Sequence, residues 1–454
     1  MPPEQARGIA EAHDTSIQQV FSTIFGLPGA LEWDAALHRL TRNLCTRQSQ
    51  LPLRLGGCGL RNSVRTSCAA YWASWADSIR GVCQRFPAIG NRMLHDLMQA
   101  SGAPAAAPRC ILLAEMAGTE CESQGLRDRP AWVDLAAGQR PPVPMQSEVQ
   151  LGEWQHGWQY FASDAIEKRE LGELMMALAL PSTRSNAASA GKARLHSCMG
   201  RFSSAWMIVA PTCDSLSLSN IEFQIAMRRR LGIATSFEGP DTHGHSSLTT
   251  NVGGRLNARH TCWNVAWRQV FSEAGGQVPD RNWERMLSRT HIRVPPGDTR
   301  RLDLVVPGLN VARGLPLFCD GTVLNPLTGT GQARPSTSNV GGRLLVQATA
   351  ENNNTYHEVV SSGLGALYSL GAEVFGRWSS QAVTLLVELA RERSRGMHPR
   401  LRRSTALGLQ HRWAGILGIG LQRGVAHIVA NDFGADLVRT QLEPALCLAD
   451  LASV

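Results

Sequence analysis

The chain has 454 residues, of which 43% are hydrophobic and 18% are charged. This length is sufficient for two or three domains with hydrophobic cores, and the charge content is too low for a disordered acidic or basic tail protein. No apolar run reaches the roughly 18 residues of a membrane span, and the N-terminus lacks the layout of a signal peptide. We therefore expect a soluble intracellular protein, nuclear or cytoplasmic, with no membrane partner.

The basic residues are nearly all arginine. Lys168 and Lys192 are the only lysines among 45 basic residues, and the formal net charge is +8. Arginine binds phosphate bidentately and stacks on bases, so this bias fits a nucleic-acid partner, although a genome-wide arginine bias explains it equally well. The 11 cysteines form no C-x-x-C pair, and we expect them to be reduced and mostly buried.

The N-terminal part of the chain predicts helices around a glycine-rich turn. Residues 8–47 carry apolar side chains at helical spacing, and residues 51–60 hold three glycines within four positions. Glycines permit close backbone approach or positive φ. Because neither G-x-G-x-x-G nor a Walker lysine is present, we expect a structural turn and no phosphate cradle. Residues 61–80 predict a helix with Tyr71, Trp72 and Trp75 in a core.

The middle of the chain predicts softer connections. Residues 101–150 are rich in Ala, Pro and Gly, and residues 181–197 form a second basic connector. A helix is predicted from about Ser219, capped by Ser219 or Asn220, with Phe223 and Met227 on its buried face. Three arginines stand near its C-terminal end, where cations are favoured; they fit either a nucleic-acid backbone or a solvated helix end. These are Arg228, Arg229 and Arg230.

Two short apolar runs within residues 300–326 each carry one carboxylate, Asp303 and Asp320. Their β-branched valines favour strands, and Pro-Gly and Asn-Pro pairs close the runs as turns. Two carboxylates on adjacent strands can hold a divalent metal against a phosphodiester. A hairpin whose acids are simply solvated is the alternative.

Several segments carry a resemblance to one family. Residues 51–63 and 69–78 look like the region just after the polymerase core of non-LTR retrotransposon polyproteins, and residues 202–232 resemble the region before their endonuclease. Arg301-Leu-Asp303-Leu-Val resembles the family's Arg-Pro-Asp-Leu-Val. Asp320-Gly-Thr-Val-Leu-Asn-Pro326 resembles its Asp-Val-Thr-Val-x-x-Pro. Together these motifs look like the core of a restriction-like endonuclease of the PD-(D/E)xK class.

The resemblance implies an α/β (α+β) fold, in which a helical N-terminal module precedes a PD-(D/E)xK domain with a helical C-terminal extension. It divides the chain into a thumb-like region (1–100), a linker with short helices (101–197), a helical region with a zinc-knuckle remnant (198–260), the endonuclease (261–380) and C-terminal helices (381–454). The chain would then be the C-terminal part of a polyprotein, and the polymerase carboxylates would lie upstream of it.

The resemblance also assigns site residues. Asp303 and Asp320 would be catalytic and would hold Mg²⁺ or Mn²⁺, with Glu284 as a further catalytic candidate. The expected partner is DNA, with retrotransposon RNA as a second candidate. The candidate nucleic-acid-binding residues are Arg228, Arg229, Arg230, Arg259, His260 and Arg301.

Two departures from the family pattern limit the activity to be expected. The zinc-knuckle scaffold persists over residues 241–260 without its cysteines, and His243 and His245 alone would bind zinc poorly, so we expect no zinc. No lysine follows Lys192, and residues 350–356 stand where the family's helix carries its essential lysine. Arginine is a poor proton acceptor, and losing such an electrostatic partner costs about 10²–10³ in rate.

The expected function is therefore metal-dependent nicking of target DNA by a domain whose hydrolysis is weak or lost. A non-catalytic nucleic-acid-binding module and an inert retrotransposon relic are the alternatives.

Overall fold

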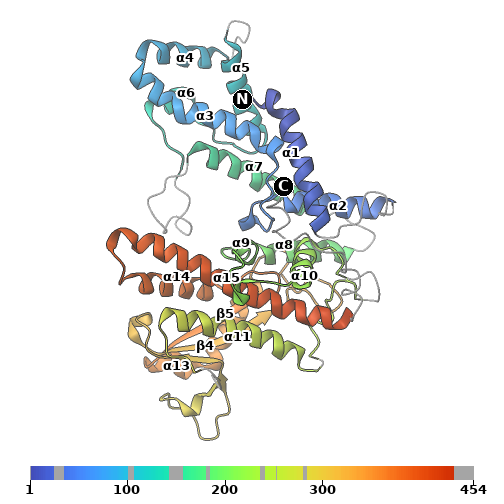
Figure 1. Ribbon diagram of the computed structural model, residues 1–454, viewed down its shortest axis with the longest axis vertical. Coiled ribbons are helices and arrows are strands. Elements are labelled where there is room, and N and C mark those ends of the chain that lie inside the picture. The colour runs from blue at the N-terminus through green and yellow to red at the C-terminus, as the bar shows by residue number, and fades with distance from the viewer. Residues whose placement is uncertain are drawn as a thin grey trace, which may run out of the picture. The chain divides into compact units, whose positions relative to one another are not determined.

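The computed structural model describes residues 2–24, 35–100, 107–142, 157–179, 185–235, 241–251, 253–279 and 284–433. Side chains of 35–41, 185–188 and 431–433 are not described. Parts of the predicted helical stretch (25–34), parts of the predicted linker (101–106, 143–156 and 180–184) and the end of the predicted C-terminal region (434–454) lie outside the described residues. The chain divides into two compact units, Met1–Ala177 (unit 1) and Leu178–Val454 (unit 2) (Figure 1).

The described part of unit 1 is helical. Its helices are α1 (Pro3–Ile24), α2 (Ala35–Ser49), the 3-10 turn η1 (Leu53–Leu55), α3 (Ser63–Arg85), α4 (Pro87–Ala100), α5 (Arg109–Ser123), α6 (Trp132–Ala137) and α7 (Trp158–Ala177). Trp72 is fully buried at the centre of the core, between Trp132 and Trp158, which confirms the aromatic core predicted on α3.

The linker predicted over 101–197 is wrong for α5 and α6. Ala114 and Ala117 are buried against α3, and a Cβ added at Gly118 would lie 2.9 Å from the Trp72 ring. Small residues allow two helices to pack closely. The Ala- and Gly-rich composition that resembles a linker is here the packing face of a core helix.

The glycine-rich turn is structural, as predicted. Gly56 and Gly59 have φ of 82° and 77°, a conformation that favours glycine. A Cβ at Gly57 would lie 1.9 Å from the carbonyl oxygen of Leu51. The turn thus folds back on its own backbone and leaves no room for a side chain at position 57.

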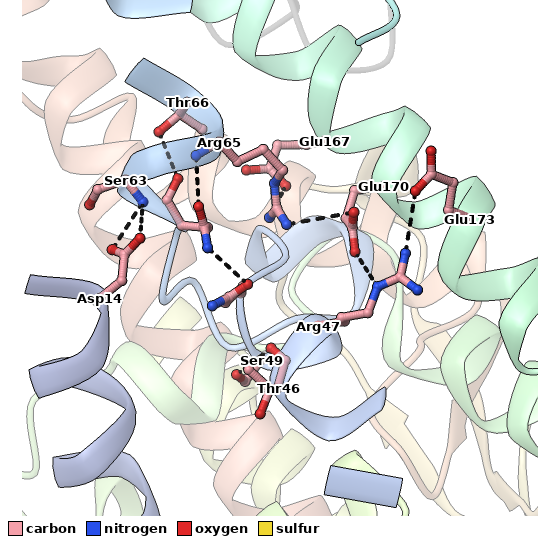
Figure 2. Close-up of polar contacts among 12 residues, drawn as sticks. Asp14, Thr46, Arg47, Ser49, Ser63, Arg65, Thr66, Glu167, Glu170 and Glu173 are labelled. Atoms are coloured by element: carbon pink, nitrogen blue, oxygen red, sulfur yellow. Dashed lines mark hydrogen bonds and ion pairs between the residues drawn. The ribbon is translucent and has the colours of Figure 1, made fainter. Parts of the chain in front are cut away.

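Ion pairs connect the helices of unit 1 around this turn (Figure 2). Arg47 on α2 donates to Glu170 on α7 at 2.7 Å, and Arg65 on α3 donates to Glu167 at 3.0 Å. Asp14 on α1 accepts the first backbone N–H groups of α3. Each of these three acids therefore accepts from a donor on another helix.

Unit 2 is mixed, so the α+β class is confirmed at this level. Its helices are α8 (Ser185–Cys198), α9 (Ala205–Ile208), α10 (Asn220–Leu231), α11 (Arg255–Ala274), α12 (Arg343–Thr355), α13 (His357–Ser362), α14 (Ser380–Ser394) and α15 (Pro399–Phe433). Its strands are β1 (Arg285–Met286), β2 (Arg301–Leu302), β3 (Leu304–Val306), β4 (Leu317–Leu324) and β5 (Ala366–Glu373). Its described residues also form the 3-10 turns η4 (Asp214–Leu216), η5 (Leu287–Arg289) and η6 (Ala312–Gly314).

The predicted boundaries at 260 and 380 do not separate compact bodies. One hydrophobic core contains Cys198, Ile225 on α10, Trp263 on α11, Leu370 on β5 and Leu417 on α15. The predicted cap of α10 is confirmed, because Ser219 and Glu222 form a capping box. Residues 198–433 are therefore packed as one body over the part that the structure describes.

The main sheet has the order β3-β4-β5, with β3 and β4 antiparallel and β4 and β5 parallel. Alternate residues of β4 face opposite sides. Cys319 and Val323 join the core that contains α11, whereas Phe318 packs with Val359 of α13. This period places Asp320 on the same side as Phe318, towards α12 and α13.

No helix among the described residues combines the length and the apolar character needed to cross a membrane.

Candidate active site

Asp303 and Asp320 come together at the start of the β3–β4 pair, as the sequence predicts. Leu304 pairs with Cys319 in antiparallel register, so the next position of this register sets Asp303 opposite Asp320. Asp320 lies within β4, whereas Asp303 lies between β2 and β3, one residue before the strand. Both side chains are largely shielded from solvent.

Asp303 is held by a backbone amide and a histidine. Its Oδ2 accepts from the N–H of Gly321 at 2.6 Å and lies 2.9 Å from Nε2 of His260. The same Nε2 is 2.8 Å from the carbonyl oxygen of Gly321. Because both neighbours are acceptors, the proton must sit on Nε2. Burial lowers the pKa of His260, but the hydrogen bond with and charge of Asp303 outweigh this, and the pKa is raised overall.

His260 is one of the candidate nucleic-acid-binding residues, and the structure places its imidazole against Asp303. It projects from α11, where Asn264 follows one turn later and approaches both ring nitrogens at 3.3–3.4 Å. A Cβ at Gly321 would lie 2.2 Å from Oδ1 of Asn264. The glycine between Asp320 and Thr322 therefore lets α11 approach the strand this closely.

Asp320 accepts hydrogen bonds from the opposite side. Nδ2 of Asn352 on α12 donates to its Oδ2 at 2.8 Å. The hydroxyl of Tyr356 lies 3.3 Å from its Oδ1 and 2.5 Å from the carbonyl oxygen of Arg301, so these two acceptors share one proton. Burial, and then the negative charge of Asp303, raise the pKa of Asp320 to about 6. Burial and the charge of Asp320 also raise the pKa of Tyr356.

Asn352 and Tyr356 are site residues that the prediction missed. The sequence signal was present, because the family's lysine-bearing helix was aligned with residues 350–356. The prediction treated the asparagines there only as lacking the function of lysine. The distance from Asn352 to Asp320 shows that one of these asparagines directly contacts an acid of the pair.

Glu284 lies at the edge of this region. It directly precedes β1, as Asp303 directly follows β2. Because Arg285 pairs with Leu302 in antiparallel register, the next position of this register sets Glu284 opposite Asp303. Its side chain is 53% exposed and lies 3.9 Å from Nη1 of Arg301, which is also exposed. Glu284 and Arg301 are thus paired with each other, and no described contact joins Glu284 to the two aspartates.

The three arginines at the end of α10 do not form a solvated helix end. Arg229 and Arg230 are 4% and 1% exposed. Arg229 donates to the carbonyl of His243, and Arg230 donates to the hydroxyl of Ser204 at 2.6 Å. Arg228, which is half-buried, donates to the carbonyl of Ala234. Each of these guanidinium groups therefore donates to an acceptor within the protein, where the sequence predicted contact with phosphate or water.

Arg259 is buried in the same way, between the zinc-knuckle remnant and the sheet. It donates to the carbonyls of Leu248 at 3.2 Å and Val323 at 2.8 Å. The stacked rings of His243 and His245 lie in this loop, and burial followed by the charge of Arg229 lowers the pKa of His245 to about 3. The remnant is thus held to the domain by arginines on α10 and α11.

Asp303 and Asp320 are the residues that could hold a metal. Among the described residues no three His, Cys, Asp or Glu side chains form a ready metal cluster. Magnesium, however, is often bound through one or two carboxylates with waters and substrate phosphates completing the shell. In the described part of the chain neither aspartate pairs with an arginine or lysine. The repulsion that raises the pKa of Asp320 is what a divalent cation would relieve, so the donor set fits Mg²⁺ or Mn²⁺.

Comparison with protein-family models and with curated proteins finds no match for this chain.

Proposed function

We propose that unit 2 is a restriction-like, metal-dependent DNA endonuclease domain of non-LTR retrotransposon origin, with impaired hydrolysis. The observation that carries the proposal is the pair Asp303 and Asp320, joined by strand register and left without an arginine or lysine partner among the described residues. Acids that serve only stability are normally paired when buried. Two shielded acids with no arginine or lysine partner, of which Asp320 has a raised pKa, are a candidate site for ligand binding.

The residues of the site would have different roles. Asp303 and Asp320 would hold the metal and orient it towards a phosphodiester. The N–H of Gly321 and the imidazole of His260 fix the Asp303 carboxylate, and Asn352 with Tyr356 fixes Asp320. A bound Mg²⁺ or Mn²⁺ would polarise the phosphoryl oxygen and lower the pKa of an attacking water.

The impairment follows from the group beside Asp320. In the retrotransposon family that the chain resembles, the corresponding helix carries a lysine. Its ammonium would position water and stabilise the developing negative charge. Asn352 fills the corresponding space with a neutral amide, 2.8 Å from Oδ2 of Asp320. Tyr356 offers no substitute, since its raised pKa keeps the hydroxyl protonated. We therefore expect a rate about 10²–10³ below that of a site with its cation.

A supercoiled-plasmid nicking assay with Mg²⁺ or Mn²⁺ tests this function. The wild-type chain should nick slowly, and Asp303→Ala and Asp320→Ala should each remove the activity. Asp134→Asn, at an exposed acid of unit 1, is the matched control and should nick like wild type. Fast nicking that both alanine variants abolish would overturn the impairment, and nicking that survives both variants would overturn the site.

A non-catalytic nucleic-acid-binding module is the second candidate. It is favoured by the hydrogen bonds from Asn352 and Tyr356, which satisfy oxygens of Asp320 without any ligand. Salt-dependent DNA binding with no nicking under any metal condition would support this candidate over the endonuclease.

A further inference from the structure

We propose that the turn between α14 and α15 is a docking surface for the phosphate backbone of double-stranded DNA. The two helices pack side by side as a hairpin (Figure 1). Six exposed arginines, which we call the arginine tip, surround its turn. They are Arg391, Arg393, Arg395, Arg400, Arg402 and Arg403. The surface is separate from the carboxylate pair, although the choice of DNA as the duplex rests on the proposed function.

The arginine tip carries little compensating charge. Glu392 is the only acid between Arg391 and Asn431 in the sequence, and it pairs with Arg395 at 2.7 Å. Arg402 donates to the carbonyl of Met397. Concentrated like charge repels itself, and a bound polyanion would relieve that repulsion.

The tip differs from the buried arginines of unit 2 in how its side chains are used. Arg229, Arg230 and Arg259 are buried and donate to the protein itself. The exposed side chains of Arg393 and Arg403, by contrast, make no hydrogen bond or ion pair with any described residue. Their donors are available for the bidentate contacts that arginine makes with phosphate.

The composition of the tip favours a duplex over a single strand. Single strands are usually bound by stacking their bases on aromatic side chains. The sequence from Arg391 to Gln410 contains no Phe, Tyr or Trp. Packed helices lie about 8–10 Å apart, a spacing comparable to the groove widths of B-DNA, about 6 and 12 Å. Arginines on both helices can therefore reach phosphates on both sides of a groove.

The start of α14 connects the tip to the carboxylate pair. Gln381 accepts from the backbone N–H of Ser369, and the hydroxyl of Ser369 accepts from Asn352, the residue that donates to Asp320. From Gln381 to Arg393 the helix rises about 18 Å. This is close to half of one duplex turn of about 34 Å, so one bound duplex can reach both places.

The test compares two triple variants of the full chain by fluorescence anisotropy, in EDTA, with a labelled duplex of about 30 base pairs, or three helical turns. Arg393→Ala/Arg400→Ala/Arg403→Ala removes three charges from the tip. Arg85→Ala/Arg92→Ala/Arg109→Ala removes three exposed charges from unit 1 and is the matched control. The tip variant should bind at least tenfold more weakly, with a salt slope reduced by about 2–3, while the control should bind like wild type. Equal losses in both variants, or none in the tip variant, would overturn the proposal.

Two further measurements identify the ligand and distinguish the docking proposal from the endonuclease proposal. Stronger binding of the tip to single-stranded RNA, or to vesicles of anionic phospholipid, than to the duplex would overturn the assignment to DNA. Asp303→Ala/Asp320→Ala should bind the duplex at least as tightly as wild type in EDTA, because the tip keeps its charges and two carboxylates that repel phosphate are removed. If neither the wild type nor any variant nicks DNA and only the tip variant loses duplex binding, the docking proposal is supported and the endonuclease proposal fails.

Discussion

The buried acids of unit 1 and the carboxylate pair of unit 2 have different partners. In unit 1, Glu115 accepts two bonds from Arg129 and one from the indole of Trp132, and Glu167 accepts from Arg65. In unit 2, Asp303 and Asp320 lie beside each other, and among the described residues His260 is the only ionisable group in contact with them that could become cationic. The first arrangement connects helices, whereas the second leaves negative charge for a ligand.

Removing a compensated acid should give the largest loss of stability. Glu115→Gln leaves the buried guanidinium of Arg129 without its main partner and should lower the free energy of unfolding by about 3–5 kcal/mol. Glu122 pairs with the same arginine at 3.1 Å but is 41% exposed. Glu122→Gln is therefore the control and should cost less than about 1 kcal/mol. Urea titration followed by tryptophan fluorescence measures the free energy of unfolding of both variants. Equal losses in the two variants would contradict the claim that Glu115 compensates Arg129 more strongly than Glu122 does.

Neutralising an acid that has no compensating charge should raise the free energy of unfolding. The pKa of Asp320 is about 6 in the folded chain, against an ordinary value of 3.8. The folded state therefore binds more protons between these values, and wild-type stability falls as pH rises through this window. Asp320→Asn should increase the free energy of unfolding by about 2 kcal/mol above pH 6, with the gain disappearing below pH 4.

Urea titrations at pH 3.5, 5 and 7.5 would measure this difference for Asp320→Asn. The exposed Glu284→Gln is the control, and its effect should stay within about 0.5 kcal/mol. A lower stability of Asp320→Asn than of wild type at pH 7.5 would contradict this prediction. It would mean that hydrogen bonds to the ionised carboxylate outweigh its burial and the repulsion from Asp303, so that Asp320 is a compensated acid.

A divalent cation should stabilise unit 2 and leave unit 1 unchanged. At a free Mn²⁺ concentration tenfold above its dissociation constant, the gain is about 1.4 kcal/mol. Thermal unfolding of the wild-type chain with and without Mn²⁺ should show a shift that Asp303→Ala/Asp320→Ala removes. An equal shift in the double variant would place the cation elsewhere.

Part of this architecture could be predicted from local sequence. The β-branched valines identified β3 and β4, Ser219 identified the start of α10, and the three glycines identified the turn at residues 56–59. These features depend on neighbours in the chain, where propensity and capping rules apply. The approach of the two aspartates followed from the same strands.

The remainder depends on contacts between distant segments. The three arginines at the end of α10 read as surface charge, yet the carbonyl that accepts from Arg229 lies 14 residues away. Asn352 is 32 residues from Asp320, and His260 is 43 residues from Asp303. The alanine-rich face of α5 reads as linker because composition alone does not show that Trp72 packs against it.

Restoring a lysine beside Asp320 tests the central claim most directly. Asn352→Lys places an ammonium where the amide now lies 2.8 Å from the carboxylate, and Asn353→Lys makes the same change one residue later, on an exposed position of α12. Because an introduced group only partly reproduces productive geometry, we expect about a tenfold increase in plasmid nicking for Asn352→Lys. Asn353→Lys should nick like wild type, and adding Asp320→Ala to Asn352→Lys should abolish nicking. Equal rates for the two lysine variants would contradict the claim that this carboxylate pair is a nuclease site lacking its cation.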